Sequence, residues 1–107
     1  MVGWQMASED FSILDTFDLR PVIGLTRGLS KTELEVLTVD AVRLHRQLVE
    51  RADQLFQALP DDFKTGKVAG GVQHLGYIEA MIEMHAQMGS LNMLIGVLGY
   101  IPKVSVN

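Results

Sequence analysis

The segment from Gln73 to Leu98 constrains the fold most strongly, because it is apolar around most of its circumference when drawn as a helix. Its only formally charged residues are Glu79 and Glu83. Apolar residues recur every three or four positions, which predicts a helix over residues 73–98 with Gly99 as its C-terminal cap. A helix with one side in water carries more polar cover than this. We therefore expect this helix to be buried on more than one side.

The preceding segment, residues 31–59, predicts an ordinary amphipathic helix with a charged outer face. Ser30 and Glu33 have the spacing of a capping box, and Leu29 can pack on Leu34 as a hydrophobic staple. Pro60 should end the helix. A second apolar stripe follows seven-residue spacing at Val42, Val49 and Phe56. The main stripe comprises Leu34, Leu37, Ala41, Leu44, Leu48, Ala52, Leu55 and Leu59.

The line along which the second helix should meet the first, its seam, includes two polar residues, His85 and Asn92. Polar side chains at such positions weaken packing but fix the register and the choice of partner helix. Both residues could equally face outward, because the helical phase near Leu91 is uncertain by one residue. The full predicted seam is Ile78, Met81, His85, Met88, Asn92 and Ile95.

These features predict an all-α fold in which residues 30–107 form an antiparallel helical hairpin with a C-terminal tail. A single hairpin has one seam, so we expect two copies to dimerise into a four-helix, coiled-coil-like bundle. Residues 1–29 form a separate N-terminal segment. Spacing in residues 1–19 allows one short helix, and Arg20–Leu29 is expected to be an extended apolar segment because Pro21, Gly24 and Gly28 disfavour a regular helix.

The composition excludes several classes of function. The chain has 107 residues, a formal net charge of −4 and no cysteine. A basic surface for nucleic acid is therefore not expected, and disulfides, thiolate metal sites and cysteine nucleophiles are impossible. The most apolar run, residues 88–101, is shorter than the roughly 20 residues of a membrane span. The N-terminus lacks the basic start of a secretory signal, so we expect a cytoplasmic protein.

The pattern of reactive side chains predicts no catalytic residue, no cofactor site and no metal site. His74 and His85 lie near Glu79 and Glu83, but the Glu-x-x-His spacing of carboxylate-bridged metal bundles is missing. We expect the histidines to be structural and the chain not to be an enzyme. Four methionines in the second helix serve either as core filler or as an adaptable surface for a partner protein.

Several strings of this sequence resemble the TraM antiactivators of rhizobial and agrobacterial plasmids. The resemblance covers nearly everything from Leu19 onward, in the same order and with the same spacing. The strings are RPVIGLTRGL at residues 20–29, LFQALP at 55–60, QHL at 73–75, YIEA at 77–80, IEMHAQM at 82–88 and LGYIPKV at 98–104.

This resemblance implies a dimer of helical hairpins that inhibits a LuxR-type, acyl-homoserine-lactone-responsive activator of conjugal plasmid transfer. The family is expected to bind the activator, largely through its DNA-binding region, and to prevent it from engaging DNA. Leu25, Leu34 and Leu59 are implied to be sensitive positions for inhibition, together with Tyr100 in the C-terminal tail. Direct contact with nucleic acid or membrane is not expected.

Three other interpretations remain open at this point. The chain could be a structural homo-oligomeric four-helix module with no regulatory partner, which the hairpin pattern alone does not exclude. It could also be a metal-dependent bundle enzyme, which metal analysis would test. A directly DNA-binding repressor is disfavoured by the net charge of −4 and by the lack of a short helix–turn–helix spacing.

Overall fold

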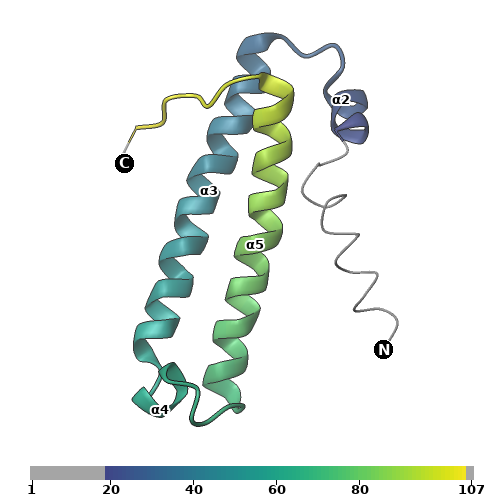
Figure 1. The fold of residues 1–107 in the computed structure, drawn as a ribbon. Helices are drawn as coiled ribbons and strands as arrows, with labels where there is room; N and C mark the ends of the chain where they lie inside the picture. Colours follow the sequence, from purple (N-terminus) through teal and green to yellow (C-terminus); the bar gives the residue numbers. More distant parts are fainter. Residues whose placement is uncertain (1–18, 106–107) are drawn as a thin grey trace, which may run out of the picture.

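The computed structural model describes residues 19–105, which form a helical hairpin with short flanking elements (Figure 1). Helices α3 (Lys31–Ala58) and α5 (Val72–Leu98) lie side by side and run antiparallel. At 1.5 Å per residue each is about 40 Å long. Helices α2 (Arg20–Thr26) and α4 (Asp61–Lys64) are short. The prediction of an all-α hairpin is confirmed, whereas the short helix allowed before residue 19 lies outside the described residues.

Helix α3 begins with the predicted capping box. The Ser30 hydroxyl accepts a hydrogen bond from the Glu33 N–H at 3.1 Å, and the Ser30 N–H donates to the Glu33 carboxylate at 3.0 Å. The hydrogen bond that the Ser30 backbone N–H donates to the carboxylate is the main cause that lowers the pKa of the Glu33 carboxyl, and the Ser30 side chain adds to this effect. At the other end Leu59 is the C-terminal cap, immediately before Pro60, so the helix ends one residue earlier than predicted.

Helix α5 is set off at both ends by glycines in backbone conformations that other residues rarely adopt. Gly70 and Gly71 precede it with φ of 92° and 88°. Gly99 ends it in the left-handed region with φ of 92°, and its N–H donates to the Ile95 carbonyl. This confirms the predicted C-terminal cap. The turn at Gly99 sends the tail back across the end of the hairpin (Figure 1).

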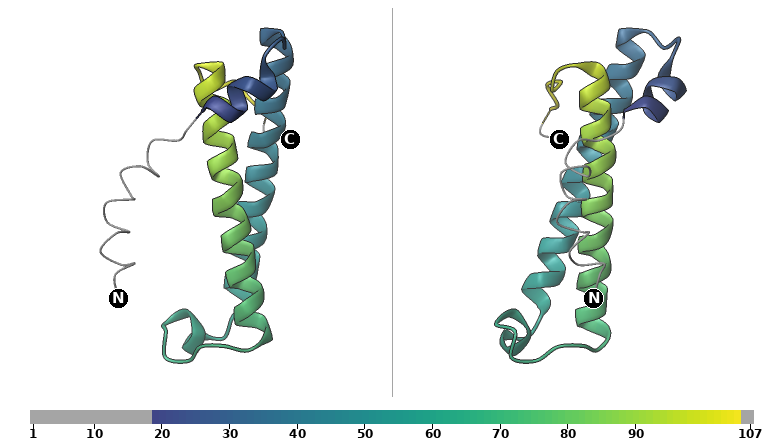
Figure 2. Two further views of the ribbon diagram at one scale, coloured as in Figure 1. Left: turned by 90° about the vertical axis from the view of Figure 1, so that its right-hand side faces the viewer. Right: turned by 45° about the vertical axis from the view of Figure 1, so that its right-hand side comes forward.

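The prediction of an extended segment over residues 20–29 is wrong, because Arg20–Thr26 forms α2. Pro21 lies in the first turn, where its missing N–H costs no intrahelical hydrogen bond. The Thr26 hydroxyl adds a bond to the Val22 carbonyl at 2.7 Å. Helix α2 lies against the C-terminal end of α5, as the views in Figure 2 show. Packing against the hairpin explains why the helix forms despite Gly24.

The core of the hairpin lies along the contact between α3 and α5. On α3 the buried residues are Thr38 and Ala52, fourteen residues apart, and Leu59 follows Ala52 after seven more. On α5 they are Ala80, Met84 and Leu91. The α3 spacings are multiples of seven and the α5 spacings are four and seven, as in a coiled-coil seam.

The predicted phase of the seam needs correction on both helices. Leu37 and Leu44 are 42% and 45% exposed, so these two members of the predicted α3 stripe lie at its outer edge. On α5 the predicted seam residues His85 and Asn92 are exposed, one position away from the buried Met84 and Leu91. In the hairpin both residues lie outside the seam, which agrees with the alternative that they face outward.

Candidate protein-docking surface

A polar pair that the sequence did not reveal occupies the middle of the seam. Gln87 donates from Nε2 to the Ala41 carbonyl at 2.8 Å, and its Oε1 lies 3.1 Å from Nδ1 of His45. With the amide in this orientation, Oε1 accepts a hydrogen bond that Nδ1–H of His45 donates. The pair joins α3 to α5 at one fixed register. It therefore has the role that the sequence suggested for His85 and Asn92.

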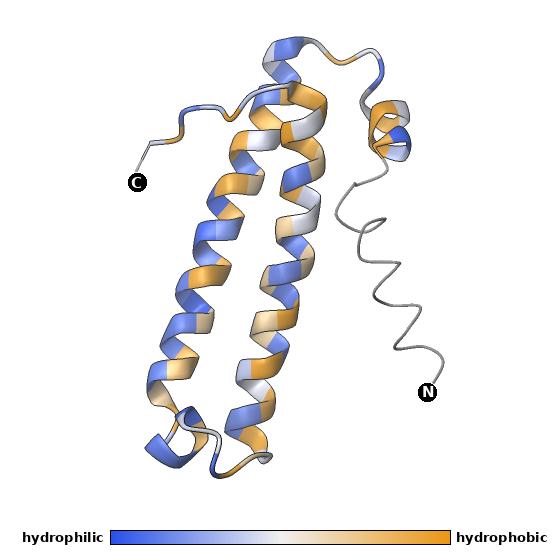
Figure 3. Cartoon of the chain, in the orientation of Figure 1, coloured by the Kyte–Doolittle hydropathy of each residue, from blue (hydrophilic) through white to orange (hydrophobic). Residues whose placement is uncertain are grey.

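The side of α5 turned away from α3 carries an exposed row of three apolar and two polar residues, which we call the outer α5 stripe. It consists of Leu75, Ile78, Ile82, His85 and Asn92, spaced three, four, three and seven residues apart. Ile82 is 64% exposed and Leu75 is 55% exposed. Apolar residues are visible on this side of the lower half of α5 in Figure 3. The stripe explains why the sequence pattern of α5 is apolar all round: one side packs on α3, and the other meets solvent in a single copy.

A shallow groove follows the outer α5 stripe. It is lined by Tyr77, Ile78, Met81, Ile82, His85 and Ala86. Met81 also reaches the neighbouring pocket between the two helices, so the two hollows are continuous through Tyr77 and Met81. Flexible thioethers and large aliphatic side chains in an open groove suit a protein partner.

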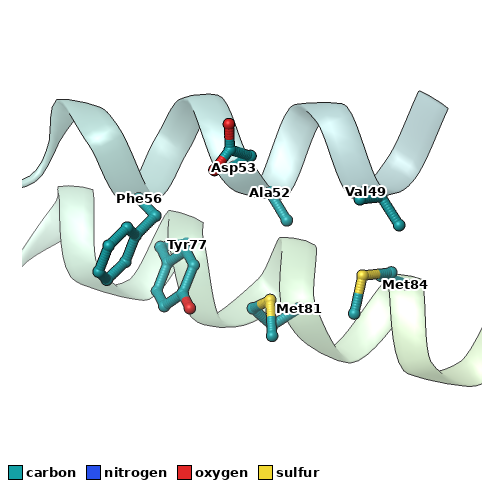
Figure 4. Close-up of a pocket in the computed structure, with 7 residues that line it drawn as sticks. All are labelled: Val49, Ala52, Asp53, Phe56, Tyr77, Met81 and Met84. Carbon is teal, nitrogen blue, oxygen red and sulfur yellow. The ribbon is translucent and has the colours of Figure 1, made fainter. Parts of the chain in front are cut away.

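The pocket between α3 and α5, which we call the interhelical pocket, is a cavity of about 280 Å³ (Figure 4). The Phe56 and Tyr77 rings lie 5.5 Å apart at a tilt of 50° and form one end of it. Asp53 is its only charged lining residue and lies on the α3 rim. The remaining lining residues are Val49, Ala52, Met81 and Met84.

The four positions implied by the family resemblance have different surroundings and do not form one cluster. Leu25 on α2 is 84% exposed and is available for contact with a partner. Leu59 at the end of α3 is only 4% exposed, so its side chain supports the fold. Leu34 is half-buried in the first turns of α3, close to the end of the hairpin where α2 lies. The apolar stripe predicted for residues 31–59 already includes Leu34 and Leu59 but not Leu25.

Tyr100 is held by the start of α3. Its hydroxyl donates to the Glu35 carboxylate, and Lys31 Nζ lies 5.1 Å from the centre of its ring. The hydrogen bond to Glu35 is the main reason that the pKa of the Tyr100 hydroxyl is raised, with desolvation and the Glu35 charge adding to it. Further along the tail, Ser105 accepts hydrogen bonds from two α3 guanidinium groups: Arg43 bonds its hydroxyl and Arg46 its carbonyl.

Two kinds of site are not found among the described residues. Within residues 19–105, no three His, Cys, Asp or Glu side chains come together in a group that could hold a metal ion. Of the helices in the same part of the chain, none has the length and hydropathy needed to cross a membrane.

Fold and surface together define a class: a small all-helical hairpin protein that exposes an apolar groove and an apolar stripe suited to binding another protein. Comparison with known proteins makes this more specific. The model of the prokaryotic transcriptional repressor TraM matches residues 6–103, which includes most of the N-terminal segment. The chain belongs to the TraM family of transcriptional repressors.

Individual relatives agree with this assignment. The chain is 61% identical over 102 residues to a transcriptional repressor TraM of Rhizobium radiobacter, covering 95% of this chain and 100% of that protein. A TraM of Agrobacterium fabrum strain C58 is 60% identical over the same length and coverage. The crystal structure of a second quorum-sensing antiactivator, TraM2, from A. tumefaciens strain A6 matches with a TM-score of 0.79 and 72% identity. That match covers 83% of this chain and all of the TraM2 chain.

Proposed function

We propose that this protein is an antiactivator of quorum sensing that binds a LuxR-type, acyl-homoserine-lactone-responsive transcription activator and prevents it from binding DNA. The protein would act in the cytoplasm, and its effect would be to repress conjugal plasmid transfer. The observation that carries the proposal is the exposed apolar surface at Leu25 on α2, in a chain of the TraM family. A repressor can act on DNA or on a protein, and this surface favours a protein.

The charge of the chain also favours a protein partner. A net charge of −4 repels the phosphate backbone. The same charge attracts the basic face that a DNA-binding domain presents to DNA, and it speeds the encounter with that face. A few apolar anchors would then supply most of the affinity. The 84% exposed Leu25 is our first candidate for such an anchor, and Tyr100 at the same end of the hairpin is the second.

We further propose that two copies associate through the outer α5 stripe. Ile78 and Ile82 would be buried between hairpins, giving the four-helix bundle expected from the sequence. His85 and Asn92 would then face the second copy and restrict its register. Replacing Ile82 with Asp places a charge in that interface and should shift the protein to single subunits in size-exclusion chromatography. An unchanged elution volume would rule out this interface.

The proposed function is tested by a competition experiment with purified components. The activator, with its acyl-homoserine lactone bound, is first loaded on fluorescently labelled promoter DNA. Adding this protein should release the DNA and lower the fluorescence anisotropy to the value of free DNA. DNA that stays bound at a large excess of the protein would contradict the proposal. If size-exclusion chromatography of the same sample shows dimers but no complex with the activator, the protein is a structural four-helix module instead.

A further inference from the structure

The interhelical pocket combines an apolar interior with a charged rim. Figure 4 shows Phe56, Tyr77, Met81 and Met84 in the space between the helices, while Asp53 projects on the α3 side, away from α5. The pocket opens along one edge of the hairpin. On the other edge Arg51 and Glu83 lie 4.0 Å apart across the two helices. The two edges therefore differ. Glu79 and Glu83 line a hollow that also contains Arg51, whereas the pocket edge places Asp53 in a hollow with two aromatic rings and no basic residue.

The Asp53 carboxylate is available for a ligand. Asp53 is exposed, and within residues 19–105 its side chain has no ion-pair or hydrogen-bond partner. A solitary carboxylate beside aromatic rings forms a site for a cation, because carboxylate and ring faces both attract positive charge.

One cation of this chain, Lys64, already lies at the aromatic end of the pocket. Lys64 Nζ lies 5.7 Å from the centre of the Phe56 ring and donates to the Gln57 carbonyl at 3.1 Å. The lysine thus approaches the ring from the α4 side and is fixed there by a backbone carbonyl. The pocket edge next to Asp53 stays open, so a second cation can reach the aromatic end.

We propose that the interhelical pocket is the socket for an arginine or lysine side chain on the DNA-binding face of the activator. This inference rests on the proposed function and names the contact through which the acidic protein competes with DNA. The aliphatic stem of the side chain would lie on Val49, Met81 and Met84, and its charged head would reach Asp53 at the rim. An arginine could in addition stack its planar guanidinium on Phe56 or Tyr77.

The chemistry explains why such a side chain fits better than a purely apolar one. An apolar side chain would fill the hollow but make no favourable contact with the Asp53 carboxylate at the rim. A basic side chain fills the apolar hollow with its methylene groups and neutralises the carboxylate at the same time. A basic residue held in this way is no longer free to bind a phosphate group of DNA.

The test compares Asp53→Asn with Asp40→Asn in a titration against the purified, acyl-homoserine-lactone-bound activator. Asp40 is a suitable control because it is an exposed aspartate on the same helix, about 20 Å from Asp53 at 1.5 Å per residue. Asp53→Asn should weaken binding about tenfold, as expected when one member of a desolvated charge pair is removed. Asp40→Asn should bind within twofold of the wild type. Added salt should also lower the affinity of the wild type more steeply than the affinity of Asp53→Asn.

A second variant tests the aromatic part of the socket. Phe56→Leu keeps an apolar side chain but removes the ring face, so it should weaken binding several-fold while circular dichroism shows unchanged helix content. Equal affinities for wild type, Asp53→Asn and Phe56→Leu would overturn the socket while leaving the proposed function intact. A wild type that does not bind the activator would instead overturn the proposed function. If Asp53→Asn changes dimerisation and leaves activator binding unchanged, the pocket belongs to the dimer interface and the socket is rejected.

Discussion

Substituting Leu59 and Leu25 separately should distinguish a position that supports the fold from one that touches the partner. Leu59 is 4% exposed and Leu25 is 84% exposed, although the family resemblance implies the same sensitivity for both. Leu59→Ala removes about three methylene equivalents, worth roughly 0.8 kcal/mol each, and leaves a cavity. We expect a loss of about 3–4 kcal/mol. That is a large fraction of the roughly 5–15 kcal/mol of a typical domain.

The assay is thermal unfolding followed by circular dichroism, with every variant at the same protein concentration, since association raises the apparent Tm. Leu59→Ala should lower the Tm on the order of 10–15 °C. Leu25→Ala should leave the Tm within about 2 °C, because exposed substitutions change stability by under about 0.5 kcal/mol. In the activator titration, Leu25→Ala should nevertheless lose affinity. A Leu59→Ala variant that melts like the wild type would refute the assignment of Leu59 to the core.

Four further outcomes follow from the described contacts. Gly76→Ala should stabilise the protein by about 0.4–1 kcal/mol in urea unfolding, because Gly76 lies inside α5 and a Cβ there meets open space. Gly99→Ala should destabilise it by about 1 kcal/mol in the same measurement, because its φ is 92°. Gln87→Ala should cost about 1–3 kcal/mol by leaving polar groups of the seam without partners, as seen in the same unfolding curves. Because the capping box lowers the pKa of Glu33 from its ordinary value of 4.5, its stabilisation is present above that pH and is lost as the pH falls through the lower, folded value. Ser30→Ala should flatten this acid-side dependence in a pH series of urea midpoints.

The helical hairpin was predictable from the sequence because local signals and hydrophobic spacing agreed. Ser30 and Glu33 marked the start of α3, Pro60 its end, and Gly99 the end of α5. Each of these signals depends only on neighbouring residues, so the printed sequence contains all the information required.

The helical phase of α5 could not be predicted in the same way. A helix that is apolar on two sides offers two stripes of similar spacing, and only its packing on α3 shows which stripe is inside. The buried stripe passes through Met84 and Leu91, while the exposed one passes through His85 and Asn92. Similarly, Arg20–Thr26 is helical because it packs against α5, a contact that Gly24 and Pro21 do not signal.

The candidate site was predictable only as a property of the surface. The lack of polar cover on residues 73–98 indicated that α5 would meet another protein. The interhelical pocket, in contrast, brings together Asp53 and Phe56 from α3 with Tyr77 and Met81 from α5. Its composition depends on the register of two helices, which the His45–Gln87 pair helps to fix and which no local motif records.

Sedimentation velocity of one mixture tests the central claim most directly, namely that this protein removes the activator from DNA by binding the activator itself. The mixture contains the protein, the signal-bound activator and fluorescently labelled promoter DNA, and absorbance and fluorescence are recorded together. The account predicts a protein complex that sediments without fluorescence, while the labelled DNA sediments at its free rate. A fluorescent boundary that contains activator and DNA at a large excess of this protein would contradict it.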